Sequence, residues 1–465
     1  MKFGRTLALL GAFLALLAVV LFFDARGKKR AAGKEKGSEL TDVASADVVR
    51  MSLKNENGAL MFARNDKGDW AITEPLEAAA DPAEADSLAG SFAGLKIERV
   101  VEAEPADPGQ YGIPGREVAL WLKGKDAPIR LLIGMENPID KTLFAKREDE
   151  KRVVLIGGHL KPILDKGLFD FRRKDVFAFA KSAVTAIKVR SGGPSWEASK
   201  KDGDWFLESP VAALAEKGRV EALIDSLAGL RAKEFTAEKR TDEDVRKNGL
   251  DKPEYEVVLS RPTEGREVTI ALHKDGERVS AMSSLTDEII LVENPILTEL
   301  ARKPEEYREK KVAVFDSWDA DRISVTAGGV SLAALKEKTG DADKWLLESE
   351  GKTEADGSKV EAFLRKIGGL EAVEFIDTPK SLAAYGLERP QAEVKIRITD
   401  YEGRVREWTL LVGAEDKDEK QVVVKNAALS YLFRVDASFL HELPKEAKDW
   451  RAAPETKPGE ARKAP

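Results

Sequence analysis

Residues 203–230, GDWFLESPVAALAEKGRVEALIDSLAGL, decide the fold of this chain because they contain a complete strand-to-helix unit. Trp205 opens a short apolar run after a Gly-Asp turn, which is the pattern of a β-strand. Leu223, Leu227 and Leu230 then recur at spacings of four and three, which places one apolar stripe on a helix. The stretch therefore predicts a β-sheet with one helix packed on its face.

The same unit occurs three times along the chain. In every copy a Gly-Leu pair ends the helical stripe, and its Leu stands 25 residues after the Trp. A third landmark is a Gly followed by an apolar residue and a Pro, and its Gly recurs every 137 residues. Landmarks repeated in one order at fixed spacing indicate tandem modules. The landmark residues are Trp70, Leu95, Gly112, Pro114, Trp205, Leu230, Gly249, Pro253, Trp345, Leu370, Gly386 and Pro390.

Each landmark has a structural explanation. The Trp fills the core between sheet and helix, and ligand stacking is the alternative. The Gly suits a turn with positive φ, the next residue can plug the core, and the Pro can start a strand, where its missing N–H is tolerated. We therefore expect an α+β protein of three tandem modules after one N-terminal transmembrane helix. Each module is predicted to be an antiparallel β-sheet packed on one main helix.

The N-terminus predicts a membrane anchor at residues 1–23. Residues 7–23 are uncharged, and as a helix they span about 26 Å, close to the roughly 30 Å of a bilayer hydrocarbon core. A cleaved signal peptide is the alternative, but Leu21, Phe22 and Phe23 stand where small residues of a cleavage site are expected. We therefore expect the anchor to be retained.

The first two modules also share an ending, because FRRKDVF at 171–177 matches YREKKVA at 307–313. The third copy shows no clear version of it, as terminal repeats often diverge. The predicted organisation is an anchor at 1–23, a flexible stalk at 24–46, modules at 47–180, 181–316 and 317–450, and a disordered tail at 451–465.

Composition excludes several classes of function. The net charge of −7 arises from 75 basic and 82 acidic residues spread along the chain, which argues against nucleic acid as a partner. There is no cysteine, and His159, His273 and His441 are too far apart in sequence to suggest a metal site. Lys352 lies in the end of a phosphate-loop pattern, but Leu346 replaces the Gly that this loop needs. We predict no catalytic, cofactor-binding or metal-binding residue and no enzyme activity, although paired carboxylates for glycoside hydrolysis stay open.

The landmarks resemble the bacterial family known as domain of unknown function 4340, over residues 47–450. The resemblance rests on the Trp strand, on the helix that ends in an apolar Leu, and on YGLERP at 385–390. Asn248 replaces the Tyr of this motif in the second copy, and Pro114 directly follows the apolar residue in the first. The resemblance implies an N-terminal membrane helix and an association with an ABC-type transport system similar to the gliding-motility-associated kind, and it carries over no catalytic residue.

We therefore expect a non-catalytic membrane-anchored envelope protein that acts as a structural or interaction accessory. Its expected partners are the membrane, through the N-terminal helix, and proteins such as an ABC transporter permease or companion envelope proteins. The alternative is a module that binds cell-wall glycan or a small ligand, which would need aromatic residues gathered on an open face. The candidates outside the landmarks are Trp121, Trp196, Trp318 and Trp408.

The basic cluster after the apolar run would favour cytoplasmic modules, but long domains translocate largely regardless of charge. The short basic start of the chain is typical of an export signal-anchor. We predict a single-pass protein of the bacterial inner membrane with its modules on the periplasmic or extracytoplasmic side. Protease added to spheroplasts should digest the modules, and full protection while the membrane is intact would place them in the cytoplasm instead.

Overall fold

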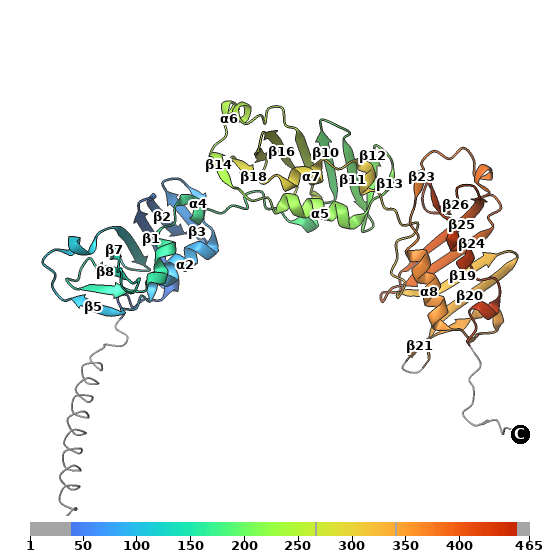
Figure 1. Cartoon of the computed structure of the whole chain (residues 1–465), viewed down its shortest axis with the longest axis horizontal. Helices are drawn as coiled ribbons and strands as arrows, with labels where there is room; N and C mark the ends of the chain where they lie inside the picture. The colour runs from blue at the N-terminus through green and yellow to red at the C-terminus, as the bar shows by residue number, and fades with distance from the viewer. Residues whose placement is uncertain (1–38, 266, 340–341, 453–465) are drawn as a thin grey trace, which may run out of the picture. The chain divides into compact units, whose positions relative to one another are not determined.

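The computed structural model describes residues 39–265, 267–339 and 342–452, and the chain divides into two compact units, Met1–Val176 and Phe177–Pro465 (Figure 1). The first unit holds one copy of the repeat and the second holds two. Each copy is a nine-stranded antiparallel sheet with one main helix of 12 residues. The prediction of three tandem antiparallel modules is confirmed.

The predicted anchor at 1–23 lies outside the described residues, as do residues 24–38 of the predicted stalk and 453–465 of the predicted tail. Among the described residues, no helix has both the length and the apolar character needed to cross a membrane.

The elements of the first module are β1 (Val48–Asn55), β2 (Gly58–Arg64), β3 (Trp70–Glu74), β4 (Ala78–Ala79), α2 (Pro82–Ala93), β5 (Arg99–Glu102), β6 (Arg116–Leu122), β7 (Ile129–Glu136), β8 (Leu143–Arg147), β9 (Val153–Ile156), α3 (Lys161–Leu164) and α4 (Leu168–Phe171). Those of the second are β10 (Ala186–Ser191), β11 (Trp196–Lys201), β12 (Asp204–Ser209), β13 (Ala213–Leu214), α5 (Lys217–Ala228), β14 (Glu234–Ala237), α6 (Asp242–Lys247), β15 (Tyr255–Ser260), β16 (Val268–Asp275), β17 (Arg278–Ser283), β18 (Ile289–Val292) and α7 (Pro295–Leu300). Those of the third are β19 (Ala320–Ala327), β20 (Val330–Thr339), β21 (Ala342–Leu347), β22 (Thr353–Glu354), α8 (Gly357–Gly368), β23 (Glu374–Ile376), β24 (Ala392–Thr399), β25 (Val405–Asp416), β26 (Gln421–Asn426) and β27 (Leu432–Asp436).

Strand order is the same in all three sheets. In the first it is β4-β3-β2-β1-β6-β7-β8-β9-β5. The chain therefore runs outward from the centre to one edge, passes through the main helix to the opposite edge, and returns to the centre before it runs outward again. Because β5 and its counterparts β14 and β23 pair with the last strand, the segments just after the helix and near the end of each module meet at one edge.

The main helix buries one apolar stripe against its sheet. The stripe forms because apolar residues recur every three or four positions, and burial of each large side chain stabilises the fold by about 1.5–3 kcal/mol. Asp356 caps α8 by accepting N–H groups of its first turn, and the helix ends at Gly368, with Gly369 as its C-cap. The buried side chains of α8 are Val360, Phe363, Leu364 and Ile367.

The third landmark is a left-handed turn. Gly112, Gly249 and Gly386 have φ angles of +69°, +70° and +69°, a region that residues with a Cβ rarely adopt. The residue after each Gly is buried. The turn recurs because both its backbone conformation and its buried apolar residue are needed in every module.

The turn covers the sheet face that lies opposite the main helix. In the third module Leu387 packs in a small cluster with Val423 and Leu432, whereas Val422 and Val424 belong to the main core. Side chains of successive strand residues point to opposite faces, so the two clusters lie on the two sides of one sheet. The third module therefore has a main core and a smaller one, and in the second module Leu250 packs in a small cluster with Ala271 and Ile289.

An aromatic residue followed by Arg closes each module. In the third, the carbonyl of Trp450 accepts the N–H of Asp356 at 2.7 Å, and Arg451 forms a backbone bridge with Ala355. The expectation that this copy lacks the ending is therefore corrected. Trp450 stands where the other modules have Phe or Tyr, and this difference hid the shared ending in the sequence. The equivalent pairs are Phe171 with Asp81, Arg172 with Ala80, Tyr307 with Glu216 and Arg308 with Ala215.

The folded modules begin earlier than the sequence boundaries. Leu40 and Thr41, placed in the predicted stalk, are buried, and the Leu40 N–H donates to the Leu95 carbonyl at 2.6 Å. Val312 makes the same contact with Leu370 at 2.9 Å, so the third module begins before residue 317. These entry segments have no periodic pattern because they are short and are held by contacts with residues far along the chain, such as the Thr41 hydroxyl with the Phe92 carbonyl.

Gly386→Ala should destabilise the third module by about 2–4 kcal/mol, because left-handed strain adds to a steric clash. A Cβ at Gly386 would lie 2.8 Å from the backbone nitrogen of Ala414. Gly403 has φ +80° and no atom within 4 Å of its Cβ position, so Gly403→Ala should cost only the strain, about 1–2 kcal/mol. Urea unfolding measures both costs, and equal values would contradict the clash.

Candidate functional site

The three landmark Trp residues lie in the cores of their own modules. Their exposed fractions are 4%, 1% and 3% in chain order. A cation from the neighbouring strand lies over each ring, at 4.2 Å from the centroid in the first module. The rings therefore offer no open face for ligand stacking. The pairs are Arg64 with Trp70, Lys200 with Trp205 and Lys336 with Trp345.

The other landmarks also shape the modules one by one. Leu95, Leu230 and Leu370 are buried just after the main helices. Each landmark Pro lies shortly before β6, β15 or β24, at Pro114, Pro253 and Pro390 respectively. In the third module Trp345 and Leu370 lie in the main core while the turn at Gly386 covers the opposite face, so the landmarks form no shared site. Leu230 also lines a surface groove.

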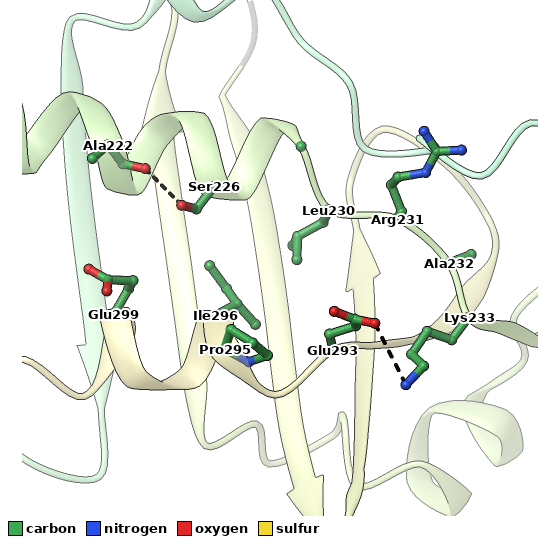
Figure 2. A pocket seen from close by; sticks show the side chains of 11 residues that line it. Ala222, Ser226, Leu230, Arg231, Ala232, Lys233, Glu293, Pro295, Ile296 and Glu299 are labelled. Atoms are coloured by element: carbon green, nitrogen blue, oxygen red, sulfur yellow. Dashed lines mark hydrogen bonds and ion pairs between the residues drawn. The ribbon is translucent and has the colours of Figure 1, made fainter.

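This groove, of about 730 Å³, lies on the second module between α5 and α7 (Figure 2). Leu230 and Ile296 are buried and form part of its floor. Ala222 and Ser226 line it from the exposed side of α5. Small residues on the helix and apolar residues beneath them leave a shallow hollow whose surface is part apolar and part polar.

Charged side chains surround the hollow, and two of the lining residues pair with each other. Lys233 lies 3.8 Å from Glu293 at one end, as Figure 2 shows. The Ser226 hydroxyl donates to the Ala222 carbonyl within its own helix at 2.8 Å, so it is not poised as a nucleophile. The groove therefore combines buried apolar residues with charged residues at its ends.

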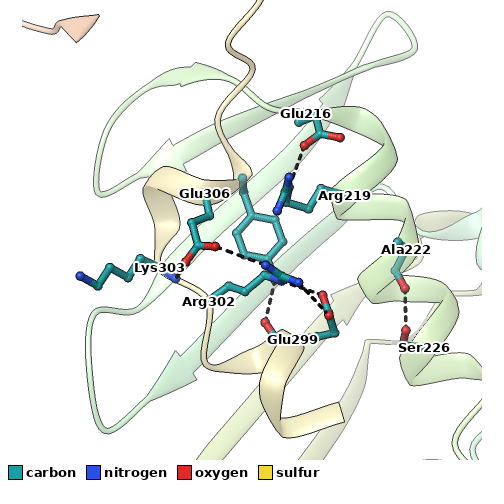
Figure 3. A network of polar contacts seen from close by, with 9 residues as sticks. Glu216, Arg219, Ala222, Ser226, Glu299, Arg302, Lys303 and Glu306 are labelled. Carbon is teal, nitrogen blue, oxygen red and sulfur yellow. Dashed lines mark hydrogen bonds and ion pairs between the residues drawn. The ribbon is translucent and has the colours of Figure 1, made fainter. Parts of the chain in front are cut away.

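A polar network continues from the other end of the groove (Figure 3). Arg302 donates two hydrogen bonds to Glu299, at 2.8 and 3.0 Å, and one to Glu306 at 3.3 Å. The Tyr307 hydroxyl donates to the Glu299 carbonyl at 2.9 Å. The network joins α7 to the closing aromatic residue of the module. The sequence signal was the spacing of these charges by three and four residues.

The titratable groups of this network are not tuned for proton transfer near neutral pH. Hydrogen bonds from Arg302 lower the pKa of Glu299, and the backbone N–H of Lys303 lowers the pKa of Glu306. Burial raises the pKa of the Tyr307 hydroxyl. These shifts keep each group in its ordinary charge state, which suits a structural network.

Metal-binding and histidine chemistry find no site in the part of the chain that the structure describes. That part contains no group of three His, Asp or Glu side chains arranged to hold a metal ion. His273 lies in β16 beneath the turn at Gly249, while His159 and His441 lie in short 3₁₀ segments of other modules.

The Trp residues outside the landmarks differ in exposure. Trp196 is buried against Tyr307, with ring centroids 4.3 Å apart, and Trp408 packs near Phe315. Trp121 is half-buried, whereas Trp318 is 64% exposed. These four residues therefore form no common aromatic surface.

A family model described as a domain of unknown function (DUF4340) matches residues 70–206, 205–387 and 345–454. Each match begins at a landmark Trp. No curated protein matches the chain. Among solved structures, the DNA polymerase III subunit beta from Pseudomonas aeruginosa is 9% identical, with 85% of this chain and 94% of that chain covered. Its TM-score of 0.12 carries no argument about fold or function.

Arg302→Gln should lower the melting temperature of the second module by a few degrees at pH 7. Because the pKa of Glu299 is lowered in the folded state, this stabilisation is present above the unfolded pKa near 4.3 and is lost as pH falls through the folded pKa. The difference from wild type should therefore shrink below about pH 4. Lys303→Gln is the charge-matched control, since this side chain points away from the network in Figure 3. A difference that is the same at pH 3 and pH 7 would contradict the ion-pair explanation.

Proposed function

The chain belongs to the DUF4340 family, whose function is unknown, and from this premise we propose that it is a non-catalytic, membrane-anchored envelope protein that binds other proteins. We further propose that it serves as an accessory of an ABC-type transport system. The apolar N-terminal run would tether it to the cytoplasmic membrane, with the modules on the extracytoplasmic side. The transport association rests on the family resemblance.

The observation that carries the protein-binding proposal is the groove between α5 and α7. Its floor is apolar, and the charges at its two ends already have partners in the same module. Three of the charged lining residues, Lys233, Glu293 and Glu299, are engaged in this way, which leaves Arg231 for a charged metabolite to pair with. A protein surface with an apolar centre and a polar rim fits such a hollow better.

A second candidate function has a specific location in the third module. Trp318 is 64% exposed and Tyr401 is 93% exposed. Because Ala320 pairs with Ile398 across β19 and β24, these two aromatic residues lie at the same end of one sheet. Exposed aromatic rings are the feature that binding of cell-wall glycan would need, so this end of the sheet is where the alternative function would reside.

Photo-crosslinking tests the protein-binding proposal in intact membranes. A photoreactive amino acid at Ser226, within the groove, should give a discrete protein adduct. The same residue at Glu277, in the exposed β16–β17 turn of the same module, is the control and should give none. Equal labelling at both positions, or no adduct at Ser226, would count against a protein partner in the groove.

A sedimentation assay with purified cell-wall glycan tests the alternative function. If the chain instead sediments with purified cell-wall glycan, and Trp318→Ala with Tyr401→Ala abolishes this, glycan binding replaces the protein-binding proposal. Retained sedimentation in that double variant would show that the two aromatic residues are not the binding surface.

A further inference from the structure

The second and third modules are joined without a linker. The Glu309 N–H donates to the Leu214 carbonyl of the second module at 2.9 Å. The carbonyl of the following residue, Lys310, accepts the Ala372 N–H of the third module at 2.7 Å. Consecutive residues thus belong to different modules, and both modules lie in one compact unit.

Arg308, immediately before this junction, is buried although it is charged. Its side chain is 6% exposed, and a buried charge is costly unless it is paired. The guanidinium carbon lies 3.7 Å from the ring centroid of Phe375 and 4.4 Å from that of Tyr431. One guanidinium nitrogen lies 2.5 Å from a carboxylate oxygen of Asp377. These three residues of the third module form an aromatic and acidic cage around a side chain of the second.

Further contacts connect the same two modules. The Tyr431 hydroxyl accepts the Leu214 N–H at 3.2 Å, so one cage residue also binds the edge strand β13. Ala213, in the same strand, packs into the core cluster of the third module. Arg406 pairs with Asp204 at 2.7 Å. The cage is therefore part of a continuous interface.

The repeat supplies a comparison for Arg308. Arg451 occupies the same position at the end of the third module and makes the equivalent backbone bridge. Its side chain is 54% exposed and pairs with Glu350 of its own module. The closing Arg can therefore serve its own module from the surface, and the burial of Arg308 reflects its contact with the following module.

We infer that the cage of Phe375, Tyr431 and Asp377 is a guanidinium-binding site that fixes the second and third modules as one rigid body. Arg is suited to this role because its planar, weakly hydrated group stacks on rings and pairs with a carboxylate at the same time. Lys would supply the charge without the planar stacking surface. Without this clamp, the remaining contacts at Ala213, Leu214 and Asp204 would hold the two modules less firmly.

The distance between two spin labels tests the inference directly. The chain has no cysteine, so Glu277→Cys in the second module and Lys417→Cys in the third give two unique labelling sites in the full-length protein. With Arg308 intact the distance distribution should be narrow, and Arg308→Ala should broaden it at least twofold. Arg308→Lys should also broaden it, whereas Arg451→Ala, the matched control, should leave it unchanged.

Chemical rescue separates loss of the clamp from loss of folding. Ethylguanidinium at low millimolar concentration should narrow the distribution of Arg308→Ala again, and ethylammonium should not. Near-ultraviolet circular dichroism reports whether each variant is folded, and Tyr431→Phe is a milder variant that should broaden the distribution less. A folded Arg308→Ala protein with a distribution as narrow as wild type would overturn the inference. So would a broadening that ethylguanidinium and ethylammonium reverse equally.

Discussion

One backbone hydrogen bond closes every module, and the rest of the fold depends on it. The carbonyl of the closing aromatic residue accepts the N–H of the residue that precedes the main helix, at 2.7 or 2.8 Å in all three copies. The first N–H groups of a helix have no partner within the helix, so this bond satisfies one of them from the far end of the module. It also positions the aromatic ring in the core. Phe171 meets Phe62 at 5.2 Å between centroids, and Trp450 meets Phe363 at 5.7 Å.

Much of the fold was predictable because it follows from periodic or repeated patterns. The strand that contains Trp205, the helix stripe through Leu227 and the left-handed turn at Gly386 each carry a local signal. The entry segment at Leu40 and the closing pair at Trp450 carry none, since contacts with residues far away in the sequence hold them. Such contacts become visible only when the repeat is compared in three dimensions.

The candidate site was not predictable in the same way. The groove lies between α5 and α7, which are far apart in the sequence, and its chemistry depends on which charges already have partners. The corresponding part of the third module, beside α8, presents Lys359, Lys366 and His441 instead. The copies therefore share the residues that build their cores and differ in the residues that meet solvent. A partner that recognises one module need not recognise another.

The shortness of the outermost strands has a consequence for how the chain reaches this structure. β4, β13 and β22 contain two residues each, and they form one edge of their sheets. Three similar sequences in one polypeptide risk exchanging strands between copies while they fold. An edge of two residues gives an incoming strand few backbone groups to pair with, so a wrongly assembled sheet gains little. The same feature that makes these edges inconspicuous in the folded protein protects the newly made chain from mixing its own repeats.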